Sequence, residues 1–195
     1  MFTKCSSINS NVKCEAWFRS QQFIQAQRPF GEAEVAKIVV HGSQVTMDHV
    51  GWKYEPQGLT SAQLNLPYCV ATLLLEGDCF VDQFTEDKVA DPDRMRLAGK
   101  VEVEHDPEIT ARGSKFRHMV RVEVFFVDGT RLERTVQAGR GNEKDFASEA
   151  DIVAKFTNLA THVIARPQAD AIVEWILGLE GQADAASLAR LLAHA

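Results

Sequence analysis

Tyr68 is the residue whose type and position most clearly suggest chemistry, because it lies in the first turn of a predicted helix. The backbone N–H groups of a first turn lack partners within the helix, and together with the helix dipole they attract anions. A phenol at that place can donate a hydrogen bond to a carboxylate or transfer a proton. Two interpretations stay open here: an anion-binding residue, or a core residue whose hydroxyl donates to a backbone carbonyl.

A second candidate site is a cluster of small hydrogen-bonding side chains near the N-terminus. It consists of Ser6, Ser7, Asn9 and Ser10. Such side chains can bind carboxylate oxygens, and they can equally cap the helix that follows them. The pattern alone therefore leaves both roles open.

His105 and Asp106 follow a predicted strand and offer an acid–base pair, although such a pair more often ends a strand in water. The six histidines show no metal-ligand spacing with one another or with the four cysteines. The loop Gly139-Arg140-Gly141-Asn142 lacks the strand-to-helix context of a phosphate-binding loop, and no G-x-S-x-G motif of serine hydrolases is present. We therefore expect neither a metal site nor a cofactor.

The overall composition argues against several classes of protein. Lys and Arg number 21 against 27 Asp and Glu, for a formal net charge of −6, and no basic run offers a surface for nucleic acid. No apolar stretch reaches the length of a membrane span, and the N-terminus lacks the pattern of a secretion signal. The four cysteines have no C-x-x-C spacing, which is typical of reduced thiols. We expect a cytoplasmic protein that binds neither nucleic acid nor membranes.

The most apolar run of the sequence, residues 65–77, predicts one buried helix around which the other elements pack. Asn65 is a good N-cap, because its side-chain carbonyl can accept from the N–H groups of the first turn. Pro67 suits that turn, where its missing N–H removes no hydrogen bond. Gly77 is placed to end the helix in a left-handed conformation. The run has almost no polar face, so neighbouring elements must cover it on most sides.

The rest of the first 147 residues alternates between helical and strand patterns. Apolar residues at roughly helical spacing predict a helix at 12–26. Capping signals predict helical segments at 60–63 and 92–98, and a helical turn is expected at 84–89. Alternating apolar residues predict strands at 35–45, 100–104, 118–127 and 131–136. Asp128-Gly129 predicts a hairpin between the last two strands, and residues 47–59 are predicted to be a loop.

The remaining residues, 148–195, are predicted to be helical. One helix starts after Ser148, a second runs from Pro167 to Gly181, and Asp184 caps a third. The sequence thus predicts an α+β fold: an antiparallel sheet with helices packed on one face, followed by C-terminal helices. We expect two domains, an α+β domain at 1–147 and helices at 148–195 that pack on it or on a partner. The apolar residues of these helices offer a surface for a homodimer.

Several motifs, taken together, resemble those of a known family. Leu66-Pro67-Tyr68, followed by residues 70–77, resembles the segment S-L-P-Y-x-V-A-x-A-L-L-D-G of the 2-methylcitrate dehydratase/cis-aconitate decarboxylase family, known as MmgE/PrpD. Further similar segments follow in the family's order at 81–85, 90–92, 101–107, 128–129, 141–142 and 154–156. The resemblance covers nearly all of the chain. The chain resembles the family's C-terminal lid and the helices that follow the lid, whereas the family's N-terminal helical domain has no counterpart in it.

The resemblance also implies site residues. Tyr68 matches the lid tyrosine that the family places over its substrate, which implies a catalytic role. Cys5 falls on the cysteine of the family's K-P-Y-x-x-C-x-x-x-H opening, where Asn9 replaces the histidine and the lysine has no counterpart. Asparagine can hydrogen-bond to a carboxylate but cannot move a proton near neutral pH. The residues expected to bind substrate are Ser6, Ser7, Asn9 and Tyr68.

Two functions are compatible with these features. The first is a free-standing lid-type domain that binds a di- or tricarboxylate, or that completes the active site of a dehydratase, decarboxylase or epimerase with a separate helical protein. The alternative is a non-catalytic binding or interaction module that forms homo-oligomers. The chain could also be a fragment of a longer enzyme. An enzyme that acts alone is disfavoured, because one tyrosine without a partner base or metal is a weak catalytic constellation.

Overall fold

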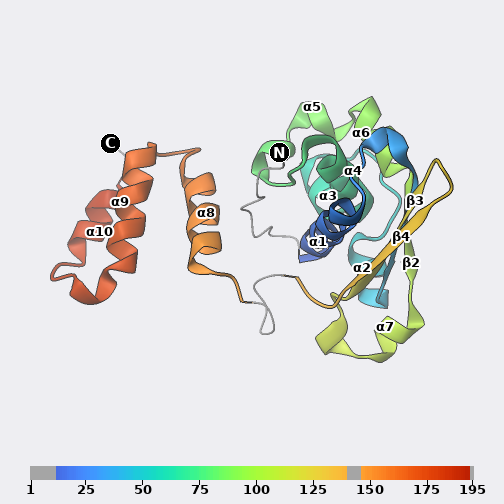
Figure 1. Cartoon of the computed structure of the whole chain (residues 1–195). Helices are drawn as coiled ribbons and strands as arrows, with labels where there is room; N and C mark the ends of the chain where they lie inside the picture. Colours follow the sequence, from blue (N-terminus) through green and yellow to red (C-terminus); the bar gives the residue numbers. More distant parts are fainter. Residues whose placement is uncertain (1–11, 140–145, 194–195) are drawn as a thin grey trace. The chain divides into compact units, whose positions relative to one another are not determined.

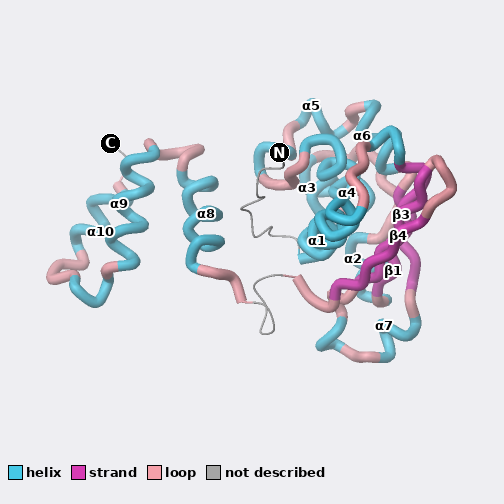
Figure 2. Tube along the Cα trace, in the orientation of Figure 1, coloured by secondary structure: helices cyan, strands magenta, loops and turns pink. Residues whose placement is uncertain are grey.

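The computed structural model describes residues 12–139 and 146–193. These residues divide into two compact units, with the boundary between Phe146 and Ala147. Figure 1 shows the course of the chain, and Figure 2 separates its helices from its strands. Each unit is described by itself below. In the described ranges, no helix combines the length and the apolar character needed to cross a membrane.

The first unit contains a four-stranded sheet, drawn in magenta in Figure 2, and its strand order is β2-β1-β3-β4. The strands are β1 (Val35–Gly42), β2 (Val101–His105), β3 (Val120–Phe126) and β4 (Arg131–Val136). The β1–β3 and β3–β4 pairs are antiparallel, whereas the β1–β2 pair is parallel. The predicted α+β class is confirmed, and the expected antiparallel pairing holds for two of the three strand pairs. The parallel pair requires a long connection between β1 and β2, and several helices supply it.

The hairpin between β3 and β4 forms where the sequence predicted it. Gly129 adopts a left-handed φ of 84°, which is unfavourable for residues with a Cβ atom. The Asp128 carboxylate accepts hydrogen bonds from the backbone N–H and the hydroxyl of Thr130, at 2.9 and 2.6 Å. These contacts fix the turn and therefore the register of the two strands.

Seven α-helices are described in the first unit. They are α1 (Val12–Gln27), α2 (Gln44–Val50), α3 (Leu59–Leu64), α4 (Leu66–Glu76), α5 (Glu86–Val89), α6 (Pro92–Ala98) and α7 (Pro107–Ala111). The loop prediction for 47–59 was wrong at its start, because α2 covers residues 44–50. The strand prediction also ran too far, since Ser43 caps α2 by accepting from the backbone N–H of Thr46 and so ends β1 at Gly42.

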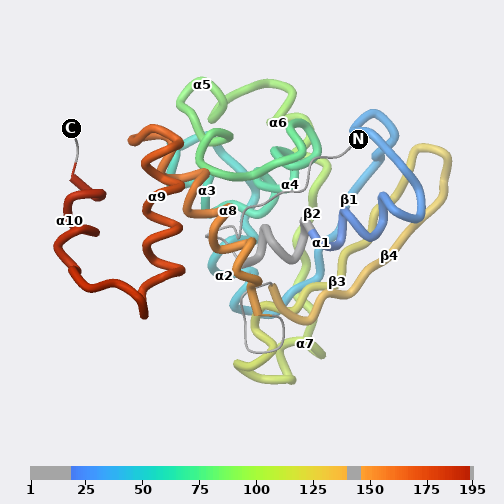
Figure 3. The backbone as a smooth tube through the Cα atoms, turned by 60° about the vertical axis from the view of Figure 1, so that its left-hand side comes forward, coloured from blue at the N-terminus to red at the C-terminus, as the bar shows by residue number. Residues whose placement is uncertain are grey.

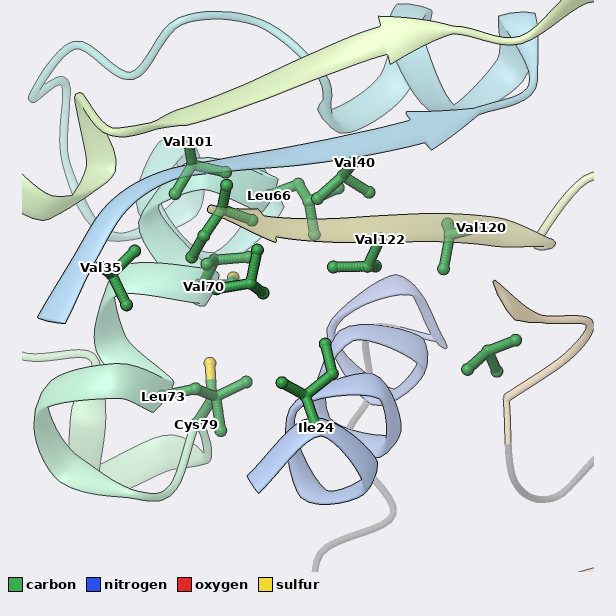
Figure 4. Packing of buried hydrophobic residues seen from close by; sticks show 14 of the residues in the cluster. Ile24, Val35, Val40, Leu66, Val70, Leu73, Cys79, Val101, Val120 and Val122 are labelled. Carbon is green, nitrogen blue, oxygen red and sulfur yellow. The ribbon is translucent and has the colours of Figure 1, made fainter. Parts of the chain in front are cut away.

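Helices α1 and α4 cover the same face of the sheet and enclose its main core (Figure 4). Ile24 of α1 and Val70 of α4 are fully buried against sheet residues such as Val122. Complete burial of a side chain of this size stabilises the fold by about 1.5 to 3 kcal/mol. The core is therefore a helix layer on a sheet, as the apolar run at 65–77 required.

The buried N-terminus of α4 is held by the side chain of Asn65, which is itself 0% exposed. Its Oδ1 accepts from the backbone N–H of Tyr68 at 2.9 Å, and its Nδ2 donates to the carbonyl of Trp52 at 2.6 Å. At the other end, Gly77 has a left-handed φ of 73°. The predicted N-cap and the predicted end of this helix are both confirmed.

The second unit is helical throughout its regular structure. It contains α8 (Glu149–Ala160), α9 (Arg166–Leu177) and α10 (Ala186–Leu192). Ser148 and Asp151 form a reciprocal capping box at the start of α8. Helix α9 ends at Gly178, three residues before the predicted Gly181. Helices α9 and α10 lie side by side (Figure 3), and the indole N–H of Trp175 donates to the hydroxyl of Ser187 at 2.7 Å.

Replacing Asn65 by Ala is expected to destabilise the first unit by about 2 to 4 kcal/mol. The change removes the N-cap and also leaves the carbonyl of Trp52, in a partly buried position, without its donor. Asp91→Ala is the matched control, because Asp91 caps α6 by one bond, to the backbone N–H of Arg94 at 2.8 Å. We expect about 1 kcal/mol for that variant. Urea unfolding followed by circular dichroism measures both, and equal losses would contradict the double role of Asn65.

Candidate functional site

Tyr68 lies in a second cluster of buried residues, on the side of α4 that faces α6, and its side chain is 0% exposed. The phenol donates a hydrogen bond to the carbonyl of Lys88 at 3.1 Å. The ring packs against Tyr54, with centroids 4.6 Å apart, and against Phe84 at 5.9 Å. This geometry supports the interpretation of Tyr68 as a core residue whose hydroxyl donates to a backbone carbonyl.

A buried arginine lies beside this tyrosine. The Arg94 side chain is only 5% exposed, and its guanidinium stands over the Tyr68 ring, 5.5 Å from the centroid. It donates to the Thr72 hydroxyl at 2.7 Å and forms a short ion pair with Glu76. Glu76 also accepts from the Lys88 ammonium at 2.9 Å. Tyr68, Thr72 and Glu76 are spaced four residues apart on α4, so one face of the helix carries the whole arrangement.

The protonation of these groups follows from their surroundings. Burial raises the pKa of Tyr68 well above its usual value, and the nearby Arg94 offsets only part of that rise. Burial likewise raises the pKa of the Tyr54 hydroxyl, which donates to the carbonyl of Val89 at 2.9 Å. Burial also tends to raise the pKa of Glu76, but the hydrogen bonds from Arg94 and Lys88 outweigh it, and the net shift is downward. Both phenols are therefore neutral donors near pH 7, and Glu76 is an anion.

The other predicted substrate-binding residues, Ser6, Ser7 and Asn9, lie outside the described residues. Their approach to Tyr68 stays a prediction. His105 and Asp106, the candidate acid–base pair, lie within the described residues. The ring Nε2 of His105 lies 2.9 Å from the Thr110 hydroxyl, and Asp106 caps α7. These contacts support the interpretation that His105 and Asp106 end a strand.

A metal centre needs several ligating side chains in one place. No group of three or more histidine, cysteine, aspartate or glutamate side chains gathers in the described part of the chain. Cys69 and Cys79 are buried thiols that form no disulfide within it.

Two surface grooves were missed at the sequence level. The first, of about 840 Å³, lies between α1 and β4 in the first unit. The residues that line it are Arg19, Gln22, Phe23, Arg134, Thr135, Val136, Gln137 and Ala138. One signal could have revealed it: Arg134 occupies a position between Leu132 and Val136, on the side of β4 that faces the helices. A charged residue at an inward strand position indicates either a buried ion pair or an opening.

The second groove, of about 480 Å³, lies between α8 and α9 in the second unit. It is lined by Glu149, Ile152, Val153, Phe156, Ile172, Val173, Ile176 and Leu177. Ile152 is 58% exposed and Ile176 is 48% exposed, so large apolar side chains remain open on this surface. Such a surface is typical of a site for another protein segment.

Comparison with known proteins gives a family match over most of the chain. The sequence model described as MmgE/PrpD C-terminal domain matches residues 13–179. Cis-aconitate decarboxylase of Aspergillus terreus is 27% identical over 164 residues, which cover 82% of this chain and 33% of that protein. The cis-aconitate decarboxylase-like protein oryM of Aspergillus oryzae is 30% identical over 163 residues, covering 81% and 33%. The chain thus spans about a third of the length of these curated relatives.

The two tyrosines of the chain, Tyr54 and Tyr68, are both buried, so phenolate absorbance reports on these sites alone. We expect neither to ionise near its usual pKa of 10.0 while the protein is folded. A phenol whose pKa is higher in the folded than in the unfolded chain stabilises the fold at pH values below its unfolded-state pKa, and this contribution is lost at higher pH. The free energy of unfolding should therefore fall as the pH rises above about 10. Tyr68→Phe should reduce this loss. Normal ionisation of either phenol in the folded chain would contradict the arrangement.

Proposed function

This chain belongs to the MmgE/PrpD family as a C-terminal domain of it, and on that premise we propose that it is a lid-type domain that completes the active site of a carboxylate-acting enzyme. The helical domain of that site would come from outside residues 1–195. The observation that carries the proposal is the family match at 13–179, which runs through both compact units. Two relatives are named for cis-aconitate, so a di- or tricarboxylate is the proposed ligand class.

In this proposal Tyr68 orients the substrate or protonates it. The neutral phenol suits a donor, because it can hydrogen-bond to a carboxylate or give up its proton next to one. Its hydroxyl would have to exchange the carbonyl of Lys88 for a substrate oxygen, and that carbonyl belongs to the four-residue helix α5. The side chains of Ser6, Ser7 and Asn9 are proposed to hold further carboxylate oxygens.

The apolar groove of the second unit supports assembly with a helical partner. Helices α8 and α10 bury none of their described residues, and α9 buries three, namely Ala169, Ile172 and Trp175. Ile152 and Ile176 leave apolar area exposed on either side of the groove. Helices of another domain would remove that area from water.

The same groove favours a second candidate function, a non-catalytic module that self-associates. A homodimer formed through α8 and α9 would bury the same apolar side chains without a helical domain. The two candidates differ in the partner that the groove accepts, which the oligomeric state can decide.

Thermal melting with and without millimolar cis-aconitate or 2-methylcitrate tests the Tyr68 site. A ligand at about 100 times its dissociation constant should stabilise the chain by about 2.7 kcal/mol. We expect Tyr68→Phe to lose this gain. Tyr54→Phe is the matched control, since that buried hydroxyl also donates to a backbone carbonyl. A gain that survives Tyr68→Phe would contradict the role proposed for Tyr68.

Replacing Ile152 by Glu should prevent assembly, because the charge would have to be buried among apolar groove residues. Sedimentation of the chain, alone and mixed with the helical domain of a family member, measures this. Val163→Glu is the control, since Val163 is 66% exposed and does not line the groove. A homodimer that does not bind the added helical domain would support the second candidate function. A chain that stays monomeric in both cases would contradict both.

A further inference from the structure

The groove between α1 and β4 has the chemistry of an anion site. Five of its lining residues carry hydrogen-bond donors: Arg19, Gln22, Arg134, Thr135 and Gln137. Within the described residues, no Asp or Glu side chain lines it. Two guanidinium groups therefore share one opening in a chain whose formal net charge is −6. A cationic side chain such as that of Arg134, which pairs with no carboxylate of the described residues, attracts small anions.

The guanidinium of Arg134 is positioned by an aromatic ring. Its guanidinium lies over the ring of Phe23, 3.9 Å from the centroid, at the flank of α1. Stacking of this kind fixes the plane of the guanidinium and leaves its N–H edges available. In the part of the chain that the structure describes, Arg134 forms no ion pair.

Seven other arginines in the described ranges differ from Arg134 in this respect. Those paired with a carboxylate are Arg28, Arg94, Arg96, Arg121, Arg131, Arg166 and Arg190. Their charges are balanced within the protein and have little left to offer a ligand. Arg134 is a pre-positioned cation whose partner is an aromatic ring.

We propose that this groove binds a small, multiply charged oxyanion whose charged groups are carboxylates or phosphates. The planar fork of Arg134 can donate to two oxygens of one such group side by side, and the side chain of Arg19 lines the same opening. The side-chain amides of Gln22 and Gln137 donate to the remaining oxygens. The volume of about 840 Å³ lies within the usual size range of small-molecule sites.

The inference goes beyond the proposed function, because the groove shares no residue with the Tyr68 site and requires no helical partner. Its ligand is recognised by charge and by the geometry of its oxygens. The groove and the Tyr68 site can therefore be tested separately in the same protein.

The test is calorimetric titration of the full 195-residue chain with citrate and, separately, with inorganic pyrophosphate at low ionic strength. We expect saturable binding of at least one probe, weakened about tenfold or more in Arg134→Gln, since a bidentate charged contact is lost. Arg134→Lys should also bind less tightly, because Lys keeps the charge but not the fork. Amide signals of Thr135 and Gln137 should shift on binding in nuclear magnetic resonance spectra.

Arg96→Gln is the matched control, because it removes the same charge from a half-exposed arginine that pairs with Asp93. Binding should be unchanged in it, while a melting curve verifies that each variant folds. Binding of citrate but not of pyrophosphate would identify carboxylates as the ligand class, and the reverse result would identify phosphates. The inference is overturned if neither probe binds, if Arg134→Gln binds normally, or if Arg96→Gln weakens binding equally. Because Arg134 lines the groove and Tyr68 does not, the effect of Arg134→Gln separates this result from failure of the proposed function.

Discussion

The hydrogen bonds of Asn65 are the constraint on which the first unit depends. Helix α4 is buried on both sides, against the sheet through Leu66 and Val70 and against the second cluster through Tyr68. A helix end in such a place has no water to satisfy its N–H groups, so protein atoms must do so. Asn65 accepts from Tyr68 and donates to the carbonyl of Trp52, and it thereby joins α4 to the chain that precedes α3. The position of Tyr68 is a direct result of this cap.

The second cluster shows how a buried charge can be tolerated beside that tyrosine. Arg94 would be strongly destabilising if it were unpaired, but Glu76 and the Thr72 hydroxyl accept hydrogen bonds from its two terminal nitrogens. Glu76 in turn forms an ion pair with the ammonium group of Lys88, and the backbone carbonyl of Lys88 accepts a hydrogen bond from the phenol of Tyr68. The arrangement links α4, α5 and α6 through polar contacts. A ligand that reached the phenol would have to rearrange α5, so binding at Tyr68 and the packing of that helix are coupled.

The opposite face of the sheet explains why Arg134 stands out. There Glu123 is only 8% exposed, and it lies 2.6 Å from Arg121, 2.8 Å from Arg131 and 3.3 Å from His41. The charges of that face balance one another across neighbouring strands. Arg134 belongs to the same strand as Arg131 but points to the helix-covered side, where Phe23 is its neighbour. Alternation along β4 thus separates an arginine used for stability from one available to a ligand.

The sequence by itself determined the features that depend on neighbouring residues. The cap at Asn65, the left-handed Gly77, the Asp128-Gly129 hairpin and the capping box of α8 all follow from local backbone chemistry, and the structure has each of them. The order of the family's motifs is likewise a property of the sequence alone. It identified the chain as an MmgE/PrpD C-terminal domain, which the family match confirms.

Only the tertiary structure decided the rest, because those features join residues far apart in the chain. The parallel pairing of β1 with β2 brings Val39 beside Glu102, and no local pattern specifies that choice. Burial of the Tyr68 hydroxyl against Lys88 needs α5 folded over α4. The stacking of Arg134 on Phe23 joins β4 to α1, residues more than a hundred positions apart. Local chemistry therefore fixed where elements begin and end, whereas packing between elements decided which side chains are buried and which remain open to a ligand.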